Sequence, residues 1–141
     1  MGGDRRGSEG VRKTKKFGVV EYWSNGVVGA EEQKSWLSAT KGLQDAVEFY
    51  KLSCLVYRRF PYELKRVASQ AIASSDSVHR NIAEGYCRRS IREYLNFLNV
   101  ALGSLGESVS GLHAYREAGQ ITEDDFRVLD ELAFKVENGL L

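Results

Sequence analysis

The chain has 141 residues, of which 43% are hydrophobic, and its formal net charge is +1. This is the length of one ordinary domain with enough apolar residues for a core, and so small a net charge indicates no class of partner by itself. The sequence has no run near the roughly 20 apolar residues that span a bilayer. The basic N-terminus also lacks the apolar stretch of a secretory signal, so we expect a cytoplasmic protein with no membrane partner.

Charged residues are distributed unevenly along the chain. Residues 51–93 hold nine Lys or Arg and four acidic residues, whereas residues 122–141 hold two basic and six acidic residues. This asymmetry predicts a positive region on one part of the surface. Such a region could bind an anion, or it could meet the acidic region of a neighbouring subunit, and the two readings are about equally good.

The first 37 residues differ from the rest. Residues 1–16 are rich in Gly, Lys and Arg and have almost nothing to bury, which predicts disorder. Residues 17–29 are β-prone, and the Asn25-Gly26 step is typical of a hairpin turn. We therefore expect a flexible or hairpin-like N-terminal extension, residues 1–37, followed by one domain, residues 38–141.

The domain has four segments in which apolar residues recur at steps of three and four: residues 38–59, 62–85, 91–118 and 122–141. In the first segment this stripe is Leu43, Val47, Tyr50, Cys54 and Tyr57. Pro61, a turn after Gly85, and Gly119 separate the segments. Short connections place successive helices side by side, so the sequence predicts an all-α fold, an antiparallel up-down-up-down four-helix bundle.

The third segment, which we expect to be the longest helix, has two apolar rows. The second row is Leu95, Leu102 and Val109. Two rows indicate either the most buried helix or a helix with a second partner. Its glycines, Gly103, Gly106 and Gly111, each weaken a helix by about 1 kcal/mol relative to alanine. We therefore expect another helix to pack tightly against them.

The junction between the second and third segments has the most specific pattern, NIAEGYCRRS at residues 81–90. Ser90 and Glu93 have the spacing of a capping box, in which the serine hydroxyl takes a free amide at the helix start and the glutamate reaches back to the cap. Gly85 is expected to end the preceding helix. The turn is basic, with Arg88, Arg89 and Arg92.

Residues 77–107, SVHRNIAEGYCRRSIREYLNFLNVALGSLGE, resemble the four-helix-bundle proteins encoded in bacterial 23S rRNA intervening sequences. The resemblance extends over about residues 40–141 and depends on Asn-Ile-Ala-Glu-Gly, Arg-Arg-Ser, Phe97-Leu98 and the run from Ala101 to Ser104. It implies a ring-shaped homopentamer, but no particular activity. It also implies kinship with the accessory variability protein of diversity-generating retroelements, a basic pentamer that binds nucleic acid beside a reverse transcriptase. A reverse transcriptase or a ribosomal component is thus a suggested partner.

The chain departs from the family pattern in two places. Ile72 and Ala73 stand where the family usually has an arginine pair, and Ser77-Val78-His79 replaces a Ser-Ile-Pro motif. The lost arginines weaken the implication of a basic surface, although His79 and Arg80 supply other basic groups.

The candidate binding residues are basic or aromatic. We expect nucleic-acid phosphates to contact Arg80, Arg88, Arg89, Arg92, Lys65 and Arg66, with Tyr86 as a platform for base stacking. Asn81 and Glu84 allow two interpretations. They are ligands for a substrate or base edge, or, as we prefer, Asn81 bonds across helices and Glu84 pairs with an arginine of the turn.

The sequence offers little for catalysis. His79 and His113 have no carboxylate at metal-ligand or triad spacing, and nucleophile motifs and Gly-rich phosphate loops are missing. Cys54 and Cys87 lack metal-site or disulfide spacing. We therefore expect no enzyme, metal or cofactor. The leading hypothesis is a non-enzymatic homo-oligomer that binds RNA or DNA through a basic surface without reading sequence. The alternative is a structural or scaffolding protein-interaction module with no nucleic-acid role.

Overall fold

The computed structural model describes the backbone from Ala30 to Leu141 and the side chains from Lys41 onward. The predicted disordered segment and the predicted hairpin lie outside the described residues. The chain divides after residue 40, and residues 41–141 form one compact unit. Apart from the first residues of the first segment, this unit contains the helical segments that the sequence predicted.

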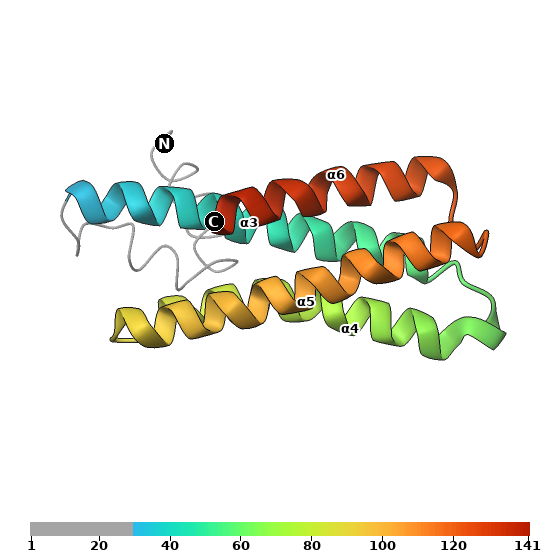
Figure 1. Ribbon diagram of the computed structural model, residues 1–141, viewed down its shortest axis with the longest axis horizontal. Helices are drawn as coiled ribbons and strands as arrows, with labels where there is room; N and C mark the ends of the chain where they lie inside the picture. Colours follow the sequence, from blue (N-terminus) through green and yellow to red (C-terminus); the bar gives the residue numbers. More distant parts are fainter. Residues whose placement is uncertain (1–29) are drawn as a thin grey trace, which may run out of the picture. The chain divides into compact units, whose positions relative to one another are not determined.

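Four long helices follow one another: α3, Ala30–Tyr57; α4, Lys65–Tyr86; α5, Ile91–Glu117; and α6, Glu123–Leu140. A short 3-10 helix, η1 (Tyr62–Leu64), precedes α4. Successive helices run in opposite directions, α5 packs against both α4 and α6, and α6 returns alongside α3 (Figure 1). At this closing contact a methyl group added to Gly139 would lie 3.5 Å from the Cα atom of Gly42. The predicted four-helix all-α fold is confirmed.

The first helix differs from its prediction. It begins at Ala30 rather than near residue 38, and its 28 residues exceed the 27 of α5. The expectation that the third helix is the longest is therefore wrong. Residues 30–34 are Ala-Glu-Glu-Gln-Lys, all strong helix formers, and acidic residues suit the positive end of the helix dipole. Propensity, rather than apolar periodicity, sets this helix start.

The core lies where the apolar stripes of the helices meet. Its largest side chains with less than 2% exposure include Phe49, Ile82, Leu112 and Leu129. The buried residues of α4 and α6 are largely those that the sequence predicted. In the middle of α3 the stripe is displaced by one position, because Phe49 and Ser53 are buried whereas Tyr50 and Cys54 are only half-buried. Leu43 and Tyr57, at the ends of the stripe, are buried as predicted.

Helices α4 and α5 approach each other through small polar side chains. The hydroxyl oxygens of Ser74 and Ser108 lie 2.9 Å apart, and those of Ser77 and Ser104 lie 2.8 Å apart. Short side chains let two helix backbones come close, as the sequence predicted for the second helix. Each hydroxyl pair also satisfies polar groups that the contact removes from water.

The second apolar row of α5 is not fully covered by the described residues. Leu95 is 50% exposed, and Leu102 and Val109 are half-buried. A Cβ atom added at Gly103 or Gly106 would find no atom of another described element within 4 Å. The helix that we expected against these glycines is therefore not one of the described helices of the same chain, and a helix of another subunit stays a prediction. Toward the described residues, this face of α5 is open.

Candidate nucleic-acid interface

The end of α4, the start of α5 and the turn between them form the α4–α5 corner, residues 84–93. Gly85 does not end α4 as predicted, because the helix continues to Tyr86 and Gly85 lacks a positive φ. A Cβ atom at Gly85 would lie 3.1 Å from the Cβ atom of Phe97 and 3.4 Å from the carbonyl oxygen of Tyr94. Glycine is needed here because α5 passes close to α4.

Ser90 caps α5 as predicted. Its hydroxyl oxygen accepts a hydrogen bond from the Glu93 amide at 3.2 Å and donates to the Glu93 carboxylate at 3.0 Å. The glutamate thus reaches the cap hydroxyl, whereas in a capping box it reaches the backbone amide. The other amides of the first turn and the helix dipole give this end of α5 a partial positive charge.

Three arginines lie at this helix start, and they differ in their contacts with neighbouring side chains. Arg88 forms an ion pair with Glu84 of α4, and its guanidinium carbon lies 4.8 Å from the centroid of the Phe97 ring. Arg89 and Arg92 are exposed, and neither has an acidic partner among the residues that the structure describes. Two uncompensated guanidinium groups therefore add to the positive helix end.

Tyr86 is part of the packing between α4 and α5. Its side chain is 7% exposed, and its ring stacks on Tyr94 with 5.4 Å between the centroids. Burial, and then the neighbouring Tyr94, raise the pKa of Tyr86 well above its ordinary value. The predicted role as a base-stacking platform is wrong, because a ring buried in this way offers no free face to a base.

Lys65 and Arg66 do not lie at the corner. They open α4, and a helix of 22 residues at 1.5 Å per residue places them about 30 Å away. Arg58 and Arg59, which the sequence reasoning missed as site candidates, lie at the same junction as Lys65. Arg59 pairs with Asp125 of α6 at 2.7 Å. The basic residues therefore fall into separate groups and do not form one surface.

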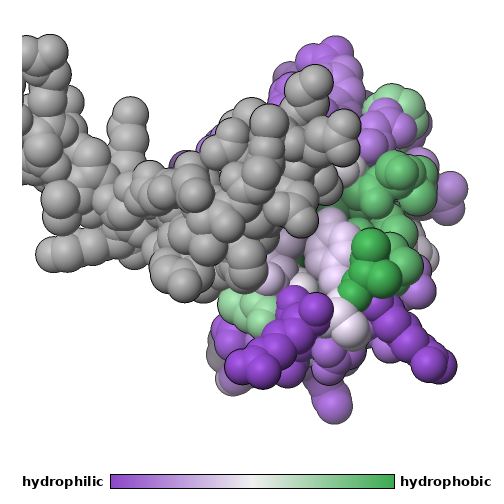
Figure 2. Space-filling model, turned by 90° about the vertical axis from the view of Figure 1, so that its left-hand side faces the viewer, coloured by the Kyte–Doolittle hydropathy of each residue, from purple (hydrophilic) through white to green (hydrophobic). Residues whose placement is uncertain are grey.

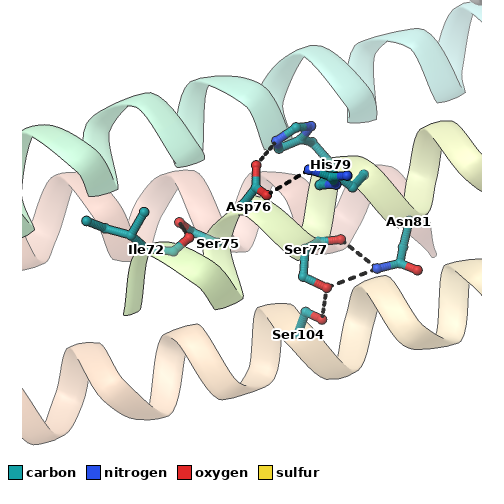
Figure 3. Close-up of polar contacts among 8 residues, drawn as sticks. Ile72, Ser75, Asp76, Ser77, His79, Asn81 and Ser104 are labelled. Carbon is teal, nitrogen blue, oxygen red and sulfur yellow. Dashed lines mark hydrogen bonds and ion pairs between the residues drawn. The ribbon is translucent and has the colours of Figure 1, made fainter. Parts of the chain in front are cut away.

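Arg80 lies in the middle of α4 and shares an acidic partner. The Asp76 carboxylate bonds to the His79 ring at 2.8 Å (Figure 3). The same carboxylate pairs with Arg80 at 3.5 Å. The His79 ring also packs against Tyr50 of α3, with 5.3 Å between the ring centroids. Asp76 offsets the local positive charge, so His79 and Arg80 do not replace the arginine pair that the family pattern has nearby.

The polar residues of the motif hold the helices together. The Asn81 side-chain amide donates to the carbonyl oxygen of Ser77 at 2.8 Å and to its hydroxyl at 3.0 Å. The Ser77 hydroxyl in turn meets Ser104 of α5 (Figure 3). Among the described residues, Asn81 therefore bonds within α4 and reaches α5 only through Ser77, which corrects the expected bond across helices. Glu84 pairs with Arg88, an arginine of the turn, as expected.

The described residues form neither a metal site nor a membrane-spanning helix. Among the described residues, no three His, Cys, Asp or Glu side chains are placed to hold a metal ion. None of the described helices is long and apolar enough to cross a membrane. Cys54 and Cys87 are both free thiols.

One protein family matches the sequence of the helical part of the chain. Residues 38–140 match the family model of the 23S rRNA-intervening sequence protein. The chain belongs to this family. Comparison with curated proteins finds no significant match. The match to the 23S rRNA-intervening sequence protein family includes the whole α4–α5 corner and all of α5, so both features belong to the family domain and not to the N-terminal extension.

Proposed function

We propose that this 23S rRNA-intervening sequence protein is a non-enzymatic homo-oligomer that binds the RNA or DNA backbone at the α4–α5 corner without reading sequence. The observation that carries the proposal is the pair of exposed guanidinium groups, Arg89 and Arg92, at the start of a long helix. Neither has an acidic partner in the described part of the chain. Arg88 adds a third guanidinium in the same turn.

The chemistry of the corner suits phosphate. A guanidinium group is planar, always charged, and matches two phosphate oxygens at once. The amides and dipole at the start of α5 favour the same negative charge. Contacts of this kind neutralise phosphates and release counterions, and they do not touch base edges, so they position a nucleic acid without specifying its sequence.

The ionisable residues support a role without catalysis. His79 and Asp76 lie one turn apart on α4, and the imidazole packs against Tyr50 of the neighbouring helix. The hydrogen bond to Asp76 positions the imidazole, which holds α3 and α4 together. His113 is likewise used between helices, since its ring lies 4.9 Å from the Phe126 ring of α6.

Two double variants test the proposal. Each removes two positive charges, one variant at the corner and the other at the start of α4. We expect Arg89→Ala with Arg92→Ala to weaken binding to a structured RNA and to duplex DNA by roughly tenfold at low salt, because each of these unpaired arginines neutralises about one phosphate. The matched control is Lys65→Ala with Arg66→Ala, which removes the same charge about 30 Å away and should lose little affinity. Fluorescence anisotropy measures both, with helix content checked by circular dichroism.

Two results would overturn this proposal. One is a wild-type protein that does not bind at low salt. The other is an equal loss in the two double variants, which would mean that total charge, and not the corner, determines binding.

A scaffolding role is the second candidate, and the exposed apolar side chains favour it. Ile91 is 76% exposed and Phe134 is 64% exposed. Figure 2 looks onto the end of the bundle that holds the corner, where hydrophobic surface emerges between hydrophilic groups. Apolar surface rimmed by polar groups is found at protein interaction sites. A wild-type protein that assembles but does not bind nucleic acid would favour this second role.

A further inference from the structure

Tyr62 is an aromatic residue that the bundle leaves in solvent. It lies in η1, at the end of the bundle opposite the α4–α5 corner (Figure 1). Tyr62 is 77% exposed, whereas Tyr57 and Tyr86 are buried. A single exposed aromatic residue is common on protein surfaces, so the groups around the ring decide whether it can be part of a binding site.

The groups around Tyr62 are mostly basic. The Lys65 ammonium lies 4.7 Å from the centroid of the Tyr62 ring and 3.4 Å from its hydroxyl oxygen. Arg66, which follows on α4, and Arg58, directly after α3, are exposed. Neither arginine has an acidic partner among the residues that the structure describes, and Glu63 of η1 pairs with neither of them. We call Arg58, Tyr62, Lys65 and Arg66 the Tyr62 site.

An exposed aromatic ring among unpaired cations suits an unpaired nucleic-acid strand. A base stacks on the ring whatever its identity, because every base has a π-face, and cations beside the ring bind the phosphates of the strand. A protein partner fits less well, because the core of a protein interface is depleted of charged residues. Within residues 58–66, all of them described, Tyr62 is the one large apolar residue that is exposed.

We propose that the Tyr62 site binds single-stranded RNA or DNA, with a base stacked on the Tyr62 ring and phosphates held by Lys65 and Arg66. This inference adds a second contact to the function proposed above and rests on its class of ligand, not on the corner. The two contacts have different requirements. Paired bases are stacked on each other and offer no free face, so a duplex uses the corner, whereas the Tyr62 site needs unpaired bases.

Two substitutions of Tyr62 separate stacking from apolar bulk. Tyr62→Phe keeps the aromatic ring, whereas Tyr62→Leu keeps an apolar side chain but has no aromatic face. We expect the full chain with Tyr62→Leu to bind an oligothymidine strand about tenfold more weakly than wild type, because the stack on one base is lost. Tyr62→Phe should bind this strand as wild type does. Fluorescence anisotropy at low salt measures the affinities, and circular dichroism checks the helix content.

The same strand paired with its complement is the control ligand. Tyr62→Leu should bind this duplex as tightly as wild type does. Lys65→Ala with Arg66→Ala should weaken binding to the single strand and change binding to the duplex little. On the single strand the log–log salt slope of this double variant should be smaller by about 1.4, at about 0.7 for each phosphate.

The outcomes separate the Tyr62 site from the corner. The Tyr62 site would be overturned by a wild-type protein that binds the duplex but not the single strand, which would leave the ring to a protein partner. It would also be overturned if Tyr62→Leu bound the single strand as tightly as wild type, if Tyr62→Phe lost as much as Tyr62→Leu, or if Tyr62→Leu lost equally on both ligands. Unchanged duplex affinity in Arg89→Ala with Arg92→Ala would overturn the corner instead.

Discussion

Gly85 and Gly119 both lie near a helix end, yet they use different properties of glycine. Gly119 has a φ of 70°, and the Gln120 amide donates to the Tyr115 carbonyl oxygen at 2.8 Å, which closes the end of α5. Gly85 is helical and leaves room for Phe97. The sequence predicted a helix end at both glycines. A residue without a Cβ atom suits a positive φ and also suits a close contact between helices, and only the packing of α5 shows which of the two roles each glycine has.

The buried tyrosines give the fold a measurable pH dependence. Burial raises the pKa of Tyr57 and Tyr86 above the ordinary value of about 10. The unfolded chain then loses these protons at a lower pH than the folded chain, so the stabilisation is complete below about pH 10 and declines as the pH rises further. We expect the urea concentration at the midpoint of unfolding to fall as the pH rises above about 10. In Tyr86→Phe this decrease should be smaller than in wild type, because one of the buried hydroxyl groups is gone. The exposed Tyr62→Phe is the control and should follow wild type, whereas a midpoint constant to about pH 12 would contradict the account.

At the scale of the element, the start of α5 depends on its cap. Ser90→Ala removes the acceptor of the Glu93 amide, and loss of a serine cap costs about 1 kcal/mol. We expect urea unfolding to show a loss of this size. Ser69→Ala, at an exposed position inside α4, is the control and should lose little. Equal stability of Ser90→Ala and wild type would mean that the cap contributes nothing.

Periodicity predicted α4, α5 and α6 well, because each buries one stripe and is bounded by Pro61, the corner or Gly119. It located the start of α3 poorly, because residues 30–34 form helix by propensity rather than by an apolar pattern. The candidate site was predicted only in part. The sequence placed Lys65 and Arg88 in one group of basic residues, although the length of α4 separates them in space. It also placed Tyr86 beside the arginines, but it could not show that packing of α5 on α4 buries the Tyr86 ring.

At the scale of the whole molecule, the number of copies is the property to measure. The ring of five that the family resemblance implies stays a prediction, and a ring joins copies through two different surfaces of each copy. Sedimentation velocity of the full chain should show a particle with five times the 15.8 kDa of one chain, and a monomer at micromolar concentration would contradict the prediction.

The central claim, that the α4–α5 corner binds phosphates, is tested most directly by the salt dependence of binding to duplex DNA. The logarithm of the binding constant should fall linearly with the logarithm of salt concentration, by about 0.9 for each phosphate neutralised. Arg89→Ala with Arg92→Ala should therefore reduce the slope by about 1.8. A double variant with the wild-type slope, or a wild-type protein without salt-dependent binding, would contradict the account.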